Sequence, residues 1–203
     1  MHELAIRVDL VASACDGRLP FTAPYAREYC YLQFRRICEL IALGSLLLHR
    51  DLPSAQSNAA RKEWNADRIM KLLQRQHPHA FPQSATRVEA DGHWRIEANS
   101  KKNALTFREF GKLYAKCGEI LHRGTIRSLE LEAHIDKSEY DEVMRWSHKI
   151  VDLLNQHVVA RAGGTGLYWV SLKTEKGGPA CSVFSNFRDG NVQVATYELE
   201  VTR

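Results

Sequence analysis

The chain lacks the features that mark several large classes of protein. Its five cysteines are scattered and no two form a C-x-x-C pair, which argues against a disulfide scaffold or a structural zinc site. No apolar run approaches the roughly 18 residues that a membrane-spanning helix needs. The first ten residues, MHELAIRVDL, show no basic region followed by an apolar core. We therefore expect a cytoplasmic protein with free thiols and no membrane partner.

Motifs that bind phosphate or metal are also missing. The glycine-rich residues 163–166 follow an expected helix and precede an expected strand, the reverse of the order in a phosphate-binding loop, so we interpret them as a linker. His77 and His79 could hold a divalent ion only with further ligands that the sequence does not identify. We therefore predict no metal site and no cofactor.

The composition is typical of a globular protein and predicts a single domain spanning residues 1–203. The chain has 203 residues, of which 44% are hydrophobic and 26% charged. Between residues 24 and 158 the apolar spacing predicts a helical bundle of four main helices, which start near residues 24, 58, 106 and 138. In the second helix, 58–76, we expect Trp64 to point inward. Thr106 and Glu109 form a capping-box pattern at the start of the third.

Strands are predicted on both sides of this bundle. An Asp-Gly pair between alternating segments indicates a β-hairpin inserted near residues 84–98. A small C-terminal antiparallel β-sheet is expected within residues 163–203, from strands at 167–173, 180–187 and 191–201. Alternation in residues 4–12 suggests a half-buried strand that joins this sheet, with a short helix as the alternative. The predicted fold class is therefore α+β, mainly helical.

The first helix of the bundle, residues 24–49, is apolar on nearly every side in its second half, apart from Glu39. Such a helix belongs in the centre of a bundle. Arg35 and Arg36 lie four and three residues before Glu39, so either arginine can pair with it. We interpret this as an ion pair of helix packing, with a functional polar site as the alternative.

Positive charge is concentrated in the middle of the chain. Residues 61–127 contain fourteen basic and seven acidic side chains, a net charge of +7. Solvated helices would explain this excess, and so would a surface that meets a phosphate backbone. For the second interpretation, the candidate contacts to nucleic acid are Arg108, Lys112 and Arg127.

His122 is the main candidate for chemistry. It falls in the last turn of the third helix, close in sequence to Lys116, Arg123 and Arg127. A histidine among cations can move a proton near a phosphate, whereas the simpler interpretation is a side chain that caps helix carbonyls. Cys117 cannot serve as a partner nucleophile, because five residues on a helix turn the two side chains roughly 140° apart. We expect Cys117 to be a buried core residue.

Residues 114–124, YAKCGEILHRG, resemble the signature helix of HEPN-like domains, and residues 36–40 resemble the early core helix of such bundles. The resemblance implies a helical bundle that dimerises; active members are metal-independent RNA endonucleases of toxins and antiviral defence, and inactive members are scaffolds. His122 matches the family's histidine. Cys117 and Gly118 stand where the family has arginine and a polar residue, and cysteine cannot hold two hydrogen bonds to a phosphate.

Three functions are compatible with this sequence. The first is a non-enzymatic HEPN-like interaction or scaffold domain that forms a homodimer through its third and fourth helices. The second is a metal-independent RNA endonuclease of the toxin or antiviral-defence type, with His122 as general acid or base and Lys116 or Arg123 stabilising the transition state. The third is a nucleic-acid-binding protein without catalysis, which uses the basic middle and the hairpin around Trp94.

Overall fold

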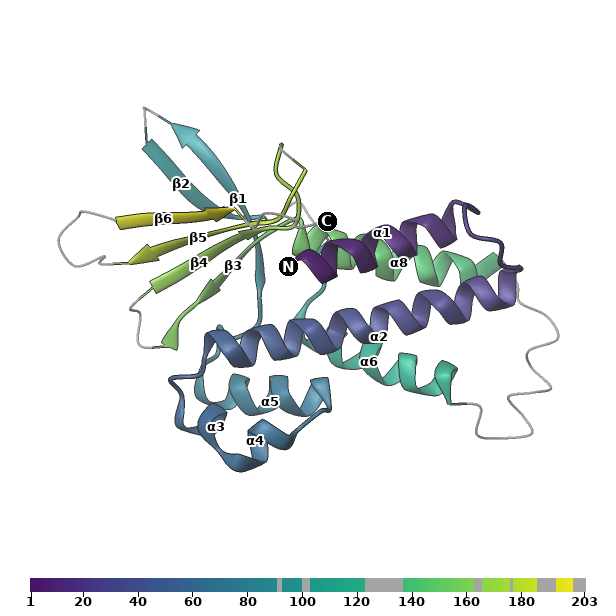
Figure 1. Cartoon of the computed structure of the whole chain (residues 1–203), viewed down its shortest axis with the longest axis horizontal. Coiled ribbons are helices and arrows are strands. Elements are labelled where there is room, and N and C mark those ends of the chain that lie inside the picture. Colours follow the sequence, from purple (N-terminus) through teal and green to yellow (C-terminus); the bar gives the residue numbers. More distant parts are fainter. Residues whose placement is uncertain are drawn as a thin grey trace.

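The computed structural model describes residues 1–90, 93–99, 103–122, 137–162, 166–175, 177–185 and 193–198. A body of helices carries an antiparallel sheet at one end (Figure 1), which confirms the α+β class. The helices are α1 (His2–Cys15), α2 (Ala23–Leu48), α3 (Pro53–Gln56), α4 (Asn58–Lys62), α5 (Ala66–Gln76), α6 (Phe107–Leu121) and α8 (Lys137–Leu154). The strands are β1 (Gln83–Ala90), β2 (His93–Ala98), β3 (Gln156–Ala160), β4 (Gly166–Ser171), β5 (Ala180–Ser185) and β6 (Gln193–Glu198).

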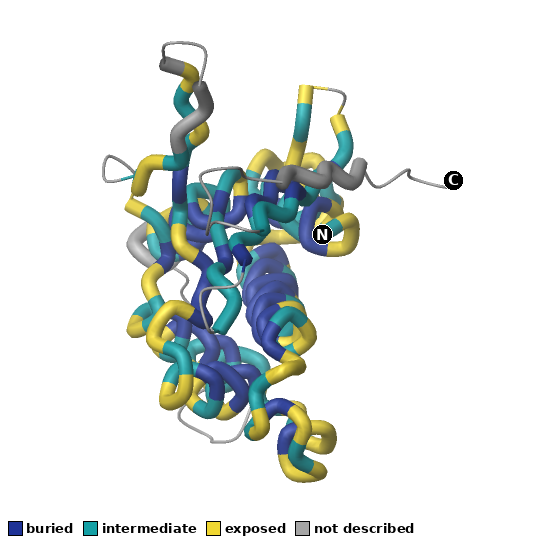
Figure 2. The backbone as a smooth tube through the Cα atoms, turned by 90° about the vertical axis from the view of Figure 1, so that its left-hand side faces the viewer, coloured by how far each residue is buried: buried dark blue, intermediate teal, exposed yellow. Residues whose placement is uncertain are grey.

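α2 is the central helix, as its apolar second half predicts. It packs against α1, α5, α6 and α8, and Figure 2 shows much of the helix buried. Pro24 lies in its first turn, where the missing N–H has no helical partner to lose. Tyr31, Phe34 and Ile37 are fully buried, and burying a large apolar side chain stabilises a fold by about 1.5–3 kcal/mol. No helix in the described part of the chain is long and apolar enough to cross a membrane.

The prediction of a strand at residues 4–12 is wrong, because this segment belongs to helix α1. Its buried residues are Leu4, Ala5, Val11 and Ala14, a helical spacing. Ile6, which the alternating pattern would place beside Leu4, is 45% exposed. The alanines of this segment favour a helix over a strand, and a short apolar alternation does not by itself separate the two.

The inserted hairpin and the C-terminal strands form one sheet, in the order β2-β1-β3-β4-β5-β6. The hairpin is confirmed, and β1 also pairs with β3 through Gln83–Val158 and Ser84–His157. β3 was not predicted, since the fourth helix was expected to continue to residue 158. That helix ends at Leu154, and the β-branched pair Val158 and Val159 enters an extended strand instead.

Two helix ends are tied to β3 through one oxygen atom. His49 and His77 follow α2 and α5 directly, as their C-caps. Their Nε2 atoms lie 3.0 and 2.8 Å from the carbonyl oxygen of Ala160. A carbonyl oxygen only accepts, so Nε2 of His77 donates to it. His49 Nδ1 also lies 2.8 Å from the carbonyl oxygen of Ser45, and the tautomer of His49 decides which of its two carbonyl neighbours accepts.

The second predicted helix is interrupted, because the chain caps two helices in succession. The Ser57 hydroxyl accepts from the N–H of Ala60 (3.1 Å) at the start of α4, and the Asn65 side chain accepts from Arg68 (3.1 Å) at the start of α5. Between them Glu63 Oε1 accepts the N–H of Trp64 and of Asn65, at 3.1 and 2.9 Å. The expectation that Trp64 points inward is therefore wrong: it lies in the link and is 69% exposed.

The capping box of the third predicted helix is confirmed at the start of α6. Thr106 Oγ1 accepts from the N–H of Glu109 (3.3 Å), and Glu109 Oε2 accepts from the N–H of Thr106 (3.1 Å). Lys149 of α8 is only 8% exposed, and its Nζ lies 3.1 Å from Glu109 Oε1. Burial raises the pKa of Glu109, but the hydrogen bonds from Thr106 and the Lys149 charge outweigh it and lower that pKa overall. This network fixes α6 to α8.

We expect His157 of β3 to make the fold sensitive to mild acid. Its side chain is 4% exposed, and burial lowers its pKa to about 4, against about 6.5 in an unfolded chain. The unfolded state therefore takes up a proton first, so stability is complete above pH ~6.5 and falls between pH ~6.5 and ~4. The loss from this group is about 3 kcal/mol.

The measurement is the free energy of unfolding in urea at several pH values, for the natural chain and for His157→Leu. Because other groups titrate as well, the informative quantity is the difference between the two pH dependences. The variant should lose distinctly less stability between pH 7 and pH 4. Equal losses in the two proteins would show that His157 is not the responsible group.

Candidate functional site

An open groove of about 330 Å³ lies between α2, the α4–α5 link and α6, and we call it the α5–α6 groove. Its lining includes Arg35, Trp64, Gly111, Tyr114, Gly118 and His122. The residues from α6 recur every three or four positions, so they share one face of that helix. Because two of them are glycines, α6 leaves space there.

The two glycines of α6 have different surroundings. A Cβ atom at Gly111 would lie 2.9 Å from Asp67 Oδ1, at the start of α5. The other oxygen of Asp67 accepts from Lys71 at 2.6 Å, which holds the carboxylate in place. A Cβ at Gly118 would meet nothing within 4 Å. Gly111 therefore allows α5 to approach α6 closely, whereas Gly118 keeps the groove open.

Arg35 brings positive charge to the groove from α2. Its Nε donates to Glu39 Oε1 at 3.2 Å, and Arg36 donates to the other oxygen at 2.9 Å, which confirms the predicted ion pair. The Arg35 guanidinium also lies over the ring of Tyr114, 5.2 Å from its centroid. Among the described residues, none accepts a hydrogen bond from Nη1 or Nη2 of Arg35. These atoms can donate to an anion in the groove.

His122 is exposed and lies directly after the last residue of α6. Its backbone N–H donates to the carbonyl of Gly118 at 3.0 Å, which closes the helix, and its side chain lines the groove. The structure thus places the predicted histidine in an open groove with an arginine. That arginine is Arg35, which the sequence reasoning had not connected with His122.

The other proposed nuclease residues are not brought together with His122 in the described part of the chain. Lys116 does not line the groove, and its Nζ lies 3.9 Å from Glu119 on the outer side of α6. Arg123 and Arg127 lie outside the described residues. The side chains of the hairpin around Trp94 also lie outside them.

Cys117 occupies the position where the HEPN-like family has arginine, and it is fully buried. Burial raises the pKa of its thiol to about 12, so it carries no thiolate near neutral pH. The expected core cysteine is confirmed. Cys117 does not line the groove.

Exposed cations flank the groove on two sides. Arg108 and Lys112 are exposed and four residues apart on α6, next to the face that lines the groove. Arg61 and Lys62 are exposed at the end of α4, just before Trp64. Within the described part of the chain, no carboxylate forms an ion pair with any of these four side chains. They are therefore available to phosphate groups.

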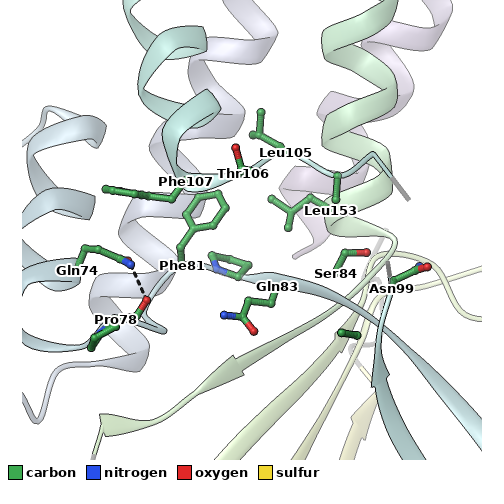
Figure 3. A pocket seen from close by; sticks show the side chains of 13 residues that line it. Gln74, Pro78, Phe81, Gln83, Ser84, Asn99, Leu105, Thr106, Phe107 and Leu153 are labelled. Carbon is green, nitrogen blue, oxygen red and sulfur yellow. Dashed lines mark hydrogen bonds between the residues drawn. The ribbon is translucent and has the colours of Figure 1, made fainter. Parts of the chain in front are cut away.

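A second cavity, of about 380 Å³, lies where the end of α5 and the starts of β1 and α6 meet (Figure 3). Phe81, Phe107 and Leu153 give it an apolar wall. The Ser84 hydroxyl is already used, because it donates to the carbonyl of Asp152 at 2.7 Å. The described lining contains no acid, base or thiol, so this cavity can hold an apolar group but cannot perform proton transfer.

Metal ligation has no support among the described residues, where no group of three or more His, Cys, Asp and Glu side chains could hold an ion. His77 instead bonds to the Ala160 carbonyl. Nδ1 of His79 lies 3.1 Å from the side-chain nitrogen of Gln83.

Compared with protein-family models, with curated proteins and with solved structures, the chain shows no match. The resemblance of residues 114–124 to HEPN-like domains therefore stays a prediction.

We expect the two groove glycines to respond in opposite ways to alanine. Glycine inside a helix is less favourable than alanine by about 1 kcal/mol, so Gly118→Ala should raise the free energy of unfolding by up to that amount. Gly111→Ala should give no gain or a loss, because Asp67 would have to move away from Lys71. Urea unfolding of both variants measures the difference, and equal gains would contradict the close approach of α5 to Gly111.

Proposed function

We propose that the chain binds single-stranded RNA in the α5–α6 groove, without catalysing a reaction. The observation that carries the proposal is the position of Trp64. A tryptophan that is 69% exposed lies at a groove whose lining also presents an arginine with free donors. Single exposed apolar side chains are common on protein surfaces, and what distinguishes Trp64 is its place in the lining of a groove that also presents Arg35.

Stacking is the interaction that Trp64 can provide. An exposed aromatic face stacks on an unpaired base of any sequence, and such a contact contributes about 1–3 kcal/mol. Single-stranded RNA presents its bases in this way, whereas the bases of a duplex are already stacked and paired. The groove therefore fits a single strand better than a double helix.

The phosphates of the strand would be met by arginine and lysine. Arg35 can donate from Nη1 and Nη2 inside the groove, and its pairing with Glu39 and its contact with Tyr114 hold the guanidinium in one orientation. Outside the groove Arg108 and Lys112 give two further positive charges on α6. Binding of this kind releases counterions, so its affinity falls as salt rises.

Catalysis is left out of the proposal because proton transfer at phosphorus usually needs both an acid and a base. His122 could serve as one of them. Of the other titratable groups in the described lining, Asp67 accepts from Lys71, and burial raises the pKa of Tyr114, although Arg35 opposes this, so that Tyr114 keeps its proton near neutral pH. RNA cleavage at His122 is therefore the second candidate function, favoured by the proximity of His122 and Arg35 in one groove.

The scaffold hypothesis, with a homodimer formed through the third and fourth helices, stays a prediction. These helices are α6 and α8, and the exposed positions described on them include Arg108, Lys112, Asp141 and Arg145. The most exposed leucines, Leu43 and Leu47, are on α2 instead. RNA binding is preferred here because it accounts for both the exposed tryptophan and the unpaired cations.

We expect Trp64→Ala to weaken binding of a fluorescently labelled, unstructured RNA by about 5- to 150-fold, the equivalent of the stacking energy. Fluorescence anisotropy at fixed salt measures the dissociation constants. Trp64→Phe, which keeps an aromatic face, should retain most of the affinity. Tyr25→Ala is the matched control, since Tyr25 is 60% exposed in the first turn of α2 and does not line the groove, and it should bind like the natural chain.

Each outcome of this experiment has a defined meaning. Unchanged affinity in Trp64→Ala, or no binding of RNA by the natural chain, would refute the proposal. Tighter binding of duplex than of single-stranded RNA would refute the stacking contact. Cleavage of the RNA by the natural chain but not by His122→Ala would replace the proposal with the endonuclease function.

We expect the double variant Arg108→Ala/Lys112→Ala to bind RNA with a shallower dependence on salt. Each lost phosphate contact reduces the slope of log K against log salt by about 0.7 for a single strand, so the double variant should lose about 1.4. Lys173→Ala is the control, because Lys173 pairs with Asp9 at 2.7 Å and does not border the groove. An unchanged slope in the double variant would exclude these cations from the interface.

A further inference from the structure

A third cavity, of about 380 Å³, lies between α2 and one face of the sheet, and we call it the α2–sheet pocket. On its sheet side are His157 of β3, Val170 of β4 and Cys181 of β5. Val170 is the register partner of both His157 and Cys181, so the three side chains share one face of the sheet. α2 contributes Leu40, Ile41, Leu43, Gly44, Ser45, Leu47 and Leu48. Cavities of this size with a mostly apolar lining are typical of small-molecule sites.

The pocket opens to solvent along α2. Leu43 and Leu47 are 50% and 66% exposed, although both line the pocket. Gly44 lies between them in the sequence and is exposed as well, and a Cβ atom there would meet nothing within 4 Å. A small molecule can therefore enter beside Gly44 and cover apolar surface that water now touches, which favours binding.

His157 gives the pocket a buried hydrogen-bond acceptor. Its Nδ1 lies 3.2 Å from the carbonyl oxygen of Leu154, and because a carbonyl only accepts, Nδ1 carries the proton. Burial lowers the pKa of His157 to about 4, so the ring is neutral near pH 7 and Nε2 has a free lone pair. In the part of the chain that the structure describes, no group donates to Nε2. A buried acceptor without a partner is unfavourable, and a donor that enters the pocket can satisfy it.

The side chains of the described lining offer no partner for a charged ligand. Glu3 is the only carboxylate among them, and its Oε1 already accepts from Nε and Nη2 of Arg7 at 3.0 and 2.6 Å. His157 is neutral, and the other described lining side chains are apolar apart from the hydroxyl of Ser45 and the thiol of Cys181. A charged group would lose its hydration here without compensation.

We propose that the α2–sheet pocket binds an uncharged apolar molecule that carries one hydroxyl group, such as an aliphatic alcohol. Its apolar part packs against the leucines of α2, and its hydroxyl donates to Nε2 of His157. This contact discriminates against a molecule of the same size that has no donor. The inference is independent of RNA binding, because the pocket and the α5–α6 groove share none of their described lining residues.

The test compares three small molecules by isothermal titration calorimetry with the full chain near neutral pH. n-Octanol has the apolar chain and the donor, its isomer heptyl methyl ether has no O–H group, and octanoate carries a negative charge. We expect n-octanol to bind, the ether to bind about 2- to 13-fold more weakly because one hydrogen bond is lost, and octanoate to bind more weakly than the alcohol. Equal affinities for the alcohol and the ether, or tighter binding of octanoate, would overturn the proposal.

Three variants locate the site. Gly44→Leu places a large side chain at the opening and should weaken binding of n-octanol by about 5-fold or more. Gly118→Leu is the matched control, since a Cβ at this helical glycine also meets nothing within 4 Å and Gly118 does not line the pocket; it should bind n-octanol like the natural chain. In His157→Leu the alcohol should lose its advantage over the ether. Circular dichroism shows whether each variant is folded, and Gly44→Leu keeps the test decisive if His157→Leu is not.

Cys181 reports directly on occupancy, because its half-buried thiol lines the pocket. We expect n-octanol to slow the alkylation of Cys181 by N-ethylmaleimide but not that of Cys15, which is partly exposed and lies outside the lining. Equal slowing of both thiols, or unchanged binding in Gly44→Leu, would place the alcohol elsewhere and overturn the proposal. So would a dimer that Leu47→Ser disrupts in a chain that binds no alcohol, because the exposed leucines would then form an interface between two copies.

Discussion

The enclosure of α2 by other helices is the constraint on which the rest of the structure depends. A helix surrounded in this way has little room for charge, so Glu39 must be neutralised where it lies, and Arg35 and Arg36 do this from the same helix. The surrounding helices leave parts of α2 uncovered: Leu43 and Leu47 are exposed in its second half, and another uncovered part lies beside the start of α5. There Arg35 reaches the surface, and the groove is a consequence of how α2 is buried.

Elements with a strong local signal could be predicted from the sequence. The capping box at Thr106, the proline at the start of α2 and the Asp-Gly pair in the sequence between the two hairpin strands are each signals within a few residues. The predictions were wrong for segments whose structure depends on contacts with residues far away in the sequence. β3 forms because β1 and β4 offer hydrogen bonds to a segment that would otherwise extend α8, and α1 is a helix because α2 offers it a surface of matching shape.

In the candidate site, too, some residues could be found from the sequence and others only from the packing of the helices. His122 and the basic stretch were visible in the sequence, since a residue type or a charge count suffices to find them. Arg35 and Trp64 were not, because their place in the groove depends on the packing of α2 against α5 and α6. A local signal for Trp64 did exist: Asn65 is a good N-cap, and Asp67 follows it in the first turn of α5, so a helix start there would have put the tryptophan outside.

The shared oxygen of Ala160 ties the position of β3 to the ends of α2 and α5. A strand that slipped by one residue would turn every side chain to the opposite face. For β3 it would also move the oxygen that His49 and His77 share, and bring the buried ring of His157 into water. His49 and His77 thus help to fix the position of β3 relative to the helices. The same position of β3 is the one in which it pairs with β1 and β4.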